Sequence, residues 1–319
     1  SIQPHGFLLV LDETDLRILQ ASENTERWLG LPARELLGCT VADLVSDAFD
    51  VRAHLARLPD DEAFPFHIGD VRLRQGAPCT EPLRVMAHRH DQVLIVEFEP
   101  VRRLANAAEQ GDYYPLVRSF VGNLHLAASL EELLQQSVQQ LKRITGFGRV
   151  KAYRFDSEGN GQVLAEVADP GYPSYLGLCF PASDIPRQAR ELYRVNRIRV
   201  IEDANYQHSK LLPATNPRTG KALDMSFAAL RSVSPVHLQY MRNMGTLASM
   251  SLSIWSTRIT ALRMIMPPSA ITPSKATKPK GALKISRAGT TPMSPSGAVR
   301  NTIHMRAKLC SCTIRISNI

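Results

Sequence analysis

The sequence contains no uninterrupted apolar run long enough to cross a bilayer, and its first residues show no signal-peptide pattern. We therefore expect a cytoplasmic protein that does not enter a membrane. Ser1 stands where an initiator methionine would, which suggests that the natural N-terminus is missing. The five cysteines are odd in number and mostly far apart, which argues against a disulfide framework. Cys310 and Cys312 form too isolated a pair to predict a metal site.

Acidic residues are absent from the last 64 positions, Ser256 to Ile319. This tail holds five lysines and six arginines, a charge of +11, whereas the whole chain carries +8. The rest of the chain is therefore mildly acidic, with a charge of −3 from 27 basic and 30 acidic side chains. Because the basicity belongs to the tail, the body of the protein does not favour a nucleic-acid partner.

The first hundred residues alternate short apolar runs with turn signals. This order predicts two strands, short helices and then three antiparallel strands, which is a single-sheet α+β domain over residues 1–105. The expected strands cover residues 7–11, 16–21, 66–74, 82–88 and 92–99, and the expected helices cover residues 26–29 and 32–37.

A second domain is expected over residues 113–255. Ser129 and Glu132 form a capping box, and apolar residues follow at helical spacing until Gly146. Residues 149–156 and 162–167 predict a hairpin, and residues 199–201 predict a strand. Ser234 and Pro235 predict the start of another helix. Residues 249–254 then alternate strictly between serine and an apolar residue.

Two of these features have both a structural and a functional interpretation. Asp184 precedes a predicted helix rich in arginine, so it can cap that helix or line a pocket for a ligand with cationic and anionic groups. The serine side of residues 249–254 can be the outer face of an ordinary sheet. Equally, its small hydroxyls can donate hydrogen bonds to a carboxylate. With Arg231 and His237, this second interpretation describes an apolar pocket with anion-binding groups.

Three motifs connect these features. Ile2 to Gly6 (IQPHG), Pro181 to Pro186 (PASDIP) and the run from Leu223 to Ser253 resemble bacterial phytochromes, the biliverdin-binding red/far-red photoreceptors. The resemblance extends from residue 1 to about residue 254, and it implies a PAS domain followed by a GAF domain. It also implies a figure-eight knot, in which the segment at Ile2 passes through a loop of the GAF domain.

The resemblance implies a biliverdin site in the GAF domain. Asp184 lies near the pyrrole nitrogens, and Ile185 and Pro186 complete its motif. One propionate is bound by Arg231 and Arg199, with Tyr193 nearby, and the other by Ser249, Ser251 and His237. His237 also helps to hold the pyrrole water, and Ser234 belongs to the same motif. Residues facing the rings match Tyr153, Phe180, Ile185, Tyr240 and Met244. This set suits a protonated tetrapyrrole, whose propionates need cationic or hydroxyl donors.

The sequence departs from the family at the chromophore attachment positions. Bacterial members attach biliverdin through a cysteine shortly before IQPHG, and this sequence begins after that point. Other members use a cysteine after the GAF histidine, where Leu238 stands here, and Cys179 matches neither position. We therefore expect weak, non-covalent biliverdin binding with little stable far-red state.

The expected function is light sensing by a photosensory fragment without its PHY and output domains, which can form a homodimer. The alternative is a non-photochemical PAS–GAF module that binds a ligand or a partner protein. No kinase, cyclase or hydrolase constellation is present in the sequence, so we expect no enzymatic activity.

The tail, residues 256–319, also departs from the family. It has no lasting periodicity and is rich in Ser, Thr, Pro and Arg, so we expect it to be largely irregular. The family instead continues with a strand, a Leu-Trp-Gly turn and a final strand that carries a second pocket histidine. We interpret the tail as an out-of-frame translation that begins near codon 255, and the alternative is a natural disordered basic tail.

The other reading frames of the gene test this interpretation. A frameshift near codon 255 predicts that another frame encodes a Leu-Trp-Gly turn followed by a His-His sequence. If neither sequence occurs in either alternative frame, the frameshift interpretation is wrong and the basic tail is natural.

Overall fold

The computed structural model describes residues 1–46, 50–56, 64–101, 118, 122, 129–184, 187–256 and 310–318. These residues form two compact units. Unit 1 takes its residues from 1–111, 188–252 and 315–319, and unit 2 from 112–187 and 253–314. The predicted boundary loop at 106–112 and most of the tail, residues 257–309, lie outside the described residues. The domain boundaries at 105, 113 and 255 therefore stay predictions.

Unit 1 contains an antiparallel sheet of six strands in the order β10-β2-β1-β5-β4-β3. The strands are β1 (Phe7–Leu11), β2 (Ile18–Ser22), β3 (Phe66–Val71), β4 (Leu83–His90), β5 (Val93–Pro100) and β10 (Leu211–Leu212). The five strands expected from the first hundred residues are confirmed, and none of their ends is shifted by more than three residues. Strand β10 was not predicted, because two residues are too few to show a periodic pattern.

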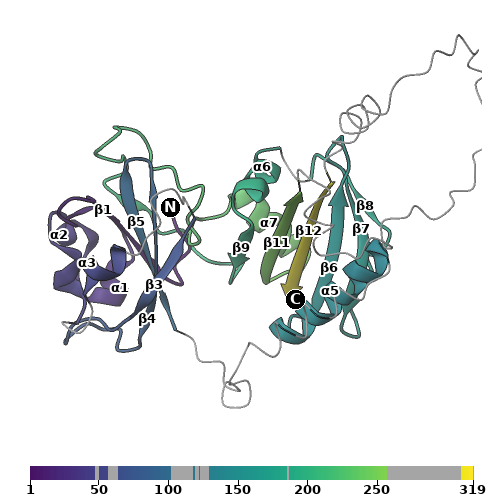
Figure 1. Cartoon of the computed structure of the whole chain (residues 1–319), viewed down its shortest axis with the longest axis horizontal. Helices are drawn as coiled ribbons and strands as arrows, with labels where there is room; N and C mark the ends of the chain where they lie inside the picture. Colours follow the sequence, from purple (N-terminus) through teal and green to yellow (C-terminus); the bar gives the residue numbers. More distant parts are fainter. Residues whose placement is uncertain are drawn as a thin grey trace, which may run out of the picture. The chain divides into compact units, whose positions relative to one another are not determined.

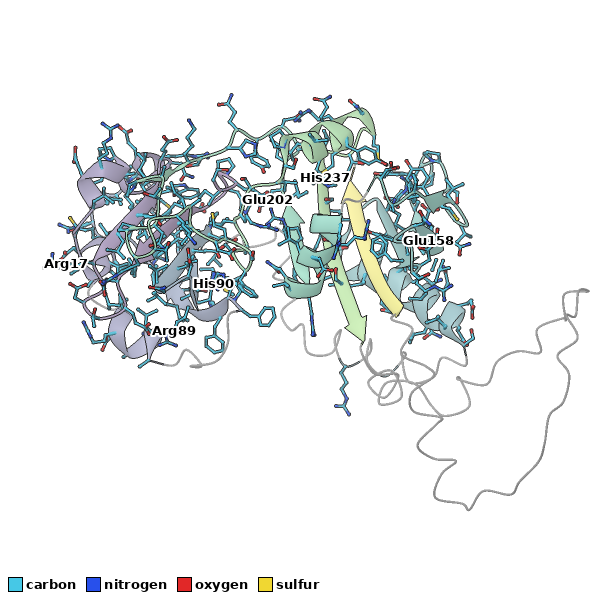
Figure 2. All side chains as sticks on the ribbon, turned by 90° about the horizontal axis from the view of Figure 1, so that it is seen from above. Arg17, Arg89, His90, Glu158, Glu202 and His237 are labelled. Carbon is cyan, nitrogen blue, oxygen red and sulfur yellow. The ribbon has the colours of Figure 1, made fainter. Side chains whose placement is uncertain are left out.

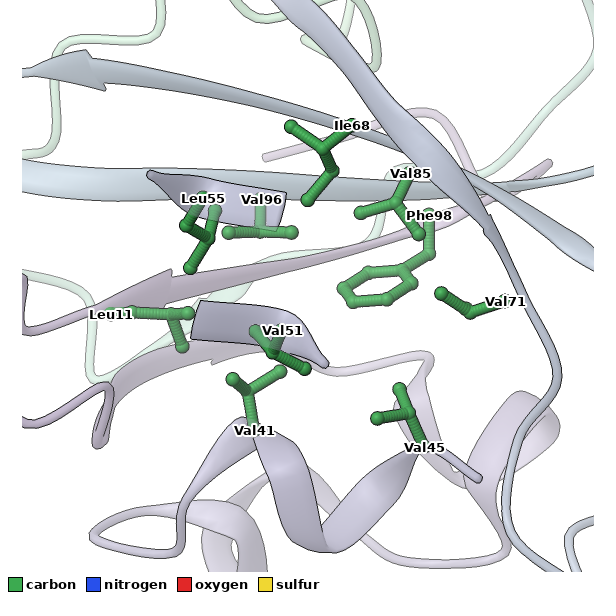
Figure 3. A pocket seen from close by; sticks show the side chains of 10 residues that line it. All are labelled: Leu11, Val41, Val45, Val51, Leu55, Ile68, Val71, Val85, Val96 and Phe98. Carbon is green, nitrogen blue, oxygen red and sulfur yellow. The ribbon is translucent and has the colours of Figure 1, made fainter. Parts of the chain in front are cut away.

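One face of this sheet packs against short helices. They are α1 (Thr25–Leu29), α2 (Ala33–Leu36), the 3-10 helix η1 (Val41–Leu44) and α3 (Val51–Leu55), and α1, α2 and α3 lie together beside the sheet (Figure 1). Trp28 and Leu36 belong to one core with Phe7 and Phe98, whose rings stack at 4.5 Å. A small cavity in this core is lined only by apolar side chains, among them Val51, Val96 and Phe98 (Figure 3). Its walls therefore offer no hydrogen bond to a polar ligand.

The opposite face of the sheet packs against chain segments far away in the sequence. Leu8 of β1 and Ile95 of β5 belong to a second core with Ile2 and Leu230. Strand β1 is thus buried on both faces, which explains why its sequence, FLLVL, is apolar throughout.

The N-terminal segment is hydrogen-bonded along both of its edges. The Ile2 nitrogen donates to the Ser209 carbonyl at 2.7 Å, and the Gln3 nitrogen donates to the Leu230 carbonyl at 2.7 Å. Ile2 forms antiparallel bridges with both Ser209 and Arg231. The loop between these two residues is therefore joined to both edges of the segment, which is the arrangement that the predicted knot requires.

Unit 1 also contains strand β9 (Ile198–Ile201), helix α7 (Pro235–Asn243) and residues 248–252 of strand β11 (Ala248–Ser256), and α6 (Arg187–Val195) precedes β9. Strand β11 pairs antiparallel with β9. Helix α7 begins at Pro235, as predicted, and its Leu238 and Met241 pack with Ile201 of β9.

In unit 2, helix α5 (Leu130–Thr145) packs against strands β6 (Arg149–Phe155) and β7 (Gly161–Ala168) (Figure 1). The Ser129 hydroxyl accepts from the Glu132 nitrogen at 3.0 Å, and Gly146 ends the helix in the left-handed conformation. The predicted helix and hairpin are therefore confirmed. The short strand β8 (Cys179–Phe180), which pairs with β7, was not predicted.

A strand, β12 (Cys310–Asn318), lies at the end of the tail. The prediction of irregular structure is therefore wrong for these residues. The β-branched residues Thr313, Ile314 and Ile316 favour an extended backbone locally, although the tail as a whole has no periodic pattern.

Two titratable side chains, Glu97 and His88, are buried on the second face of the sheet in unit 1. Their exposed fractions are 0% and 1%. Burial raises the pKa of Glu97 to about 7, although the Leu230 and Ala229 amides lower it. Burial and the nearby His90 lower the pKa of His88 to about 4. Neither ring nitrogen of His88 has a hydrogen-bond partner among the described residues, which fits a neutral ring.

These two shifts predict opposite effects of pH on stability. From pH 4.5 to about 7, folded Glu97 keeps a proton that the unfolded chain has lost, so stability falls as pH rises. From about pH 4 to 6.5, only the unfolded chain protonates His88, so stability rises with pH. Each pKa shift changes the free energy of unfolding by about 3 kcal/mol across its pH interval. The two changes have opposite signs, so they largely cancel in the wild-type protein.

Single variants should separate the two effects. Relative to wild type, Glu97→Gln should gain stability as pH rises from 4.5 to 6.5, because only the His88 effect remains. His88→Asn should lose stability over the same interval. Urea unfolding at several pH values measures the free energies, and every other group contributes equally to the three chains. If the free energy of unfolding changed with pH in both variants as it does in wild type, the pKa shifts assigned to Glu97 and His88 would be wrong.

Candidate functional site

The serine side of β11 faces inward. Ser249 and Ser251 are 3% and 5% exposed, whereas Met250 and Leu252 between them are only half-buried. The interpretation of these serines as the outer face of an ordinary sheet is therefore wrong. Ser253 continues the same side, and its buried hydroxyl has no hydrogen-bond partner within the described part of the chain. A buried donor without a partner is costly, so this side of the strand suits a polar ligand.

The buried serines lie opposite residues of β9. Ser251 pairs directly with Arg199, and Ser249 pairs with Ile201. Directly opposite residues project from the same face of a sheet, so Arg199 shares the face of the two serines. Helix α7 covers the Ser249 end of this face, where the Met241 sulfur lies 4.0 Å from the Ser249 hydroxyl. The face thus combines small hydroxyl donors with a guanidinium.

Arg199 is connected to the segment that carries Arg231. Its guanidinium nitrogens donate to the carbonyl of Ala229, at 3.3 Å, and to the carbonyl of Arg231. Both arginines are half-buried. The structure therefore places the Arg199 guanidinium beside the backbone of Arg231.

Helix α7 carries the remaining predicted residues of unit 1. His237 and Tyr240 are one helical turn apart, and their rings lie 6.4 Å apart at an interplanar angle of 18° (Figure 2). Met244, at the C-terminal cap, continues this side of the helix. Ser234 occupies the N-cap position, but its exposed hydroxyl makes no capping hydrogen bond. The hydroxyl therefore does not have the capping role that the sequence predicts.

Two predicted ring-facing residues belong to an aromatic cluster in unit 2. Tyr153 on β6 is 4% exposed, and its ring meets that of Phe155 edge to face at 5.1 Å. Phe180 on β8 packs against the same cluster and lies 6.1 Å from the Tyr175 ring. The Lys151 ammonium lies 5.0 Å from the centre of the Phe180 ring, a cation–π distance.

Asp184 lies in an exposed turn before α6. Its backbone nitrogen donates to the Pro181 carbonyl at 3.0 Å, and its carboxylate accepts from the Ser183 hydroxyl at 3.3 Å. The Ala182 nitrogen donates to the Asn160 side chain at 3.0 Å, which ties this turn to the β6–β7 turn. Ile185, Pro186 and the Tyr193 side chain lie outside the described residues. Whether Asp184 caps α6 therefore remains open.

The arrangement agrees with what known proteins show. A family model described as a PAS fold matches residues 1–101. Cyanobacterial phytochrome B of Nostoc sp. is 41% identical over 270 residues, which cover 79% of this chain and 33% of the relative. A bacteriophytochrome of Xanthomonas campestris pv. campestris is 39% identical over 263 residues, which cover 79% and 39%. The chain thus spans about a third of the length of these curated relatives.

The comparison with solved structures decides the family. The chromophore-binding domain of a Stigmatella aurantiaca phytochrome matches with a TM-score of 0.70 and 42% identity, covering 79% of this chain and 82% of that one. The chain belongs to the phytochrome family. A bacteriophytochrome of R. palustris gives the same TM-score at 41% identity, covering 80% of this chain and 50% of that one. The matched part therefore has the PAS–GAF fold of a phytochrome chromophore-binding region.

Three residues of this phytochrome region were missed by sequence reasoning. Gln3, Glu97 and Asn160 all hold backbone groups next to predicted site residues. Gln3 lies within the IQPHG motif, and Glu97 is a single acid inside the apolar run VLIVEF. The sequence therefore marks both residues as unusual for their positions. Asn160 left none, because an asparagine in a turn is explained by the turn itself.

The part of the chain that the structure describes contains neither a membrane-spanning helix nor a metal site. No helix there is long and apolar enough to span a membrane. Within the same residues, no three His, Cys, Asp or Glu side chains gather in a way that could hold a metal ion.

Proposed function

We propose that this phytochrome region senses red and far-red light by binding biliverdin. The observation that carries the proposal is the buried serine face of β11, which lies opposite Arg199. A linear tetrapyrrole with two propionates needs buried donors of this kind, since each carboxylate must replace the water that it loses. When bound, the bilin supplies absorption of red light and a ring that can rotate.

The residues of unit 1 have defined roles in this proposal. Arg231, Arg199 and Tyr193 bind one propionate, and Ser249, Ser251 and His237 bind the other. Tyr240 and Met244 face the rings from α7, next to Ser234. The contact between Arg199 and the Arg231 backbone supports the first group. The burial of both serines supports the second.

The residues of unit 2 have roles that rest more on the family. Tyr153 and Phe180 supply aromatic surface for the rings, and Asp184 supplies an acceptor for pyrrole N–H groups. The exposed position of Asp184 leaves its carboxylate accessible, which supports this role. Ile185 and Pro186 belong to the same proposal through the PASDIP motif.

The proposal extends to the setting of the protein. We place it in the cytoplasm, able to form a homodimer and without catalytic activity of its own. The expected lack of catalytic activity is supported by the matched structures, which are phytochrome chromophore-binding domains.

Absorption spectroscopy of the purified 1–319 chain tests the proposed function. Mixing with biliverdin should produce a red absorption band, and red light should change that band only transiently, with little stable far-red product. Without a red band, the non-photochemical PAS–GAF alternative would replace light sensing.

An arginine variant tests the proposed site. Arg231→Ala should weaken biliverdin binding by about 1.5–3 kcal/mol, because a half-buried propionate loses a charge-assisted hydrogen bond. This corresponds to a roughly ten- to hundred-fold rise in Kd, measured by titration at the red band. Arg27→Ala, which removes an exposed arginine on α1, is the matched control and should bind like wild type. An unchanged Kd in Arg231→Ala would remove this residue from the site.

A further inference from the structure

The backbone of residues 229–231, which carries Arg231, is held by the side chain of a distant residue, Glu97. One carboxylate oxygen of Glu97 accepts from the Ala229 nitrogen at 3.0 Å, and the other accepts from the Leu230 nitrogen at 2.7 Å. Each oxygen thus fixes one peptide N–H immediately before Arg231. Glu97 lies on β5, more than a hundred residues earlier in the chain.

The carbonyl groups of the same segment are also held. The Gln3 nitrogen donates to the Leu230 carbonyl at 2.7 Å, and the Arg199 guanidinium donates to the carbonyls of Ala229 and Arg231. The Gln3 side chain reaches the Val200 carbonyl on β9 at 2.9 Å. Two N–H groups and three carbonyls of residues 229–231 are therefore hydrogen-bonded by groups from three parts of unit 1.

Glu97 is an unusual residue for its position. Its neighbours on the second face of the sheet, including Leu8, Ile95 and Leu230, are fully buried and apolar. A residue needed only for packing would be apolar there, because taking a carboxylate out of water is costly. Both of its oxygens accept hydrogen bonds from the 229–230 backbone. The carboxylate is therefore suited to fixing that segment.

We propose that Glu97 is a positioning residue for anion binding by Arg231. Its carboxylate holds the 229–231 backbone. The backbone of Arg231 is therefore already in place when the side chain of Arg231 binds a ligand carboxylate. Preorganisation of this kind lowers the entropy lost on binding. Glu97 itself does not contact the ligand. The inference rests on the proposed function, in which Arg231 binds a propionate.

Two ligands separate this role from a general effect on the fold. Biliverdin carries two propionate carboxylates, whereas biliverdin dimethyl ester carries none but keeps the rings. The test variant is Glu97→Gln, assayed about one pH unit above the pKa of Glu97, where the wild-type side chain is a carboxylate. Glutamine keeps the size of the side chain and one acceptor oxygen. Its amide NH2 cannot accept from the second backbone N–H. We expect a roughly ten-fold weaker Kd for biliverdin. The Kd for the dimethyl ester should stay within about two-fold of wild type.

Further variants serve as controls. Glu26→Gln removes an exposed carboxylate on α1 and should bind both ligands like wild type. Glu97→Asp keeps both acceptor oxygens and should recover part of the biliverdin affinity. If Glu97 acts through Arg231, adding Glu97→Gln to Arg231→Ala should cost no further biliverdin affinity. Circular dichroism of each variant verifies that the chain is folded.

The outcomes are distinct. Equal losses for both ligands, no loss for either, or additive losses in the double variant would overturn the role of Glu97 and leave the proposed function intact. A wild-type chain that binds neither ligand would overturn the proposed function, and the role of Glu97 with it. A selective loss of biliverdin affinity that vanishes in the Arg231→Ala background supports the proposal.

Discussion

The pairing of the N-terminal segment along both edges is the constraint on which the rest of unit 1 depends. Ile2 is fully buried between Ser209 and Arg231, and together with Leu230 it covers the second face of the sheet. Without this cover, β1 and β5 would expose an apolar face to water, and the free energy gained from burying that face would be lost. Because the covering segments are irregular, their backbone groups need partners outside a regular ladder.

Those partners explain the polar residues in an otherwise apolar core. Gln3 and Glu97 satisfy the peptide groups of the covering segment, and Arg199 does so from β9. The same contacts fix the backbone position of Arg231, from which the predicted anion-binding side chain extends. If the proposed function is right, folding and ligand binding in this region depend on a common set of hydrogen bonds.

The sequence alone predicted the regular elements of this fold well. Strand β1 was identified by its apolar run next to a turn, and helix α5 by its periodicity and caps, whereas β8 and β10 are two residues long and show no pattern. Contacts such as that between Glu97 and Leu230 could not be predicted, because no local rule connects residues so far apart. A buried acid in an apolar run indicates that a partner exists, but only the fold identifies it.

For the candidate site, alternation predicted the strand but not its orientation. The pattern from Ser249 to Ile254 is the same whether the serines face water or the interior, so the sequence left both orientations open, and the outward one is wrong. The family resemblance supplied the inward orientation, since it assigned both serines to a ligand. The roles of Tyr193, Ile185 and Pro186 still rest on that resemblance, because their side chains lie outside the described residues.

The inward orientation has a physical consequence for the chemistry of the site. An arginine in the interior must itself lose water, so a buried cation is stable only with a partner, and here Arg199 uses backbone carbonyls. Serine hydroxyls are neutral and lose less on burial, so Ser249 and Ser251 can remain inside whether or not an anion is bound. The site combines hydroxyls on one strand with an arginine on the next strand that is hydrogen-bonded to backbone carbonyls. Such a site can keep its shape without a ligand. It can still offer several hydrogen-bond donors to a ligand carboxylate.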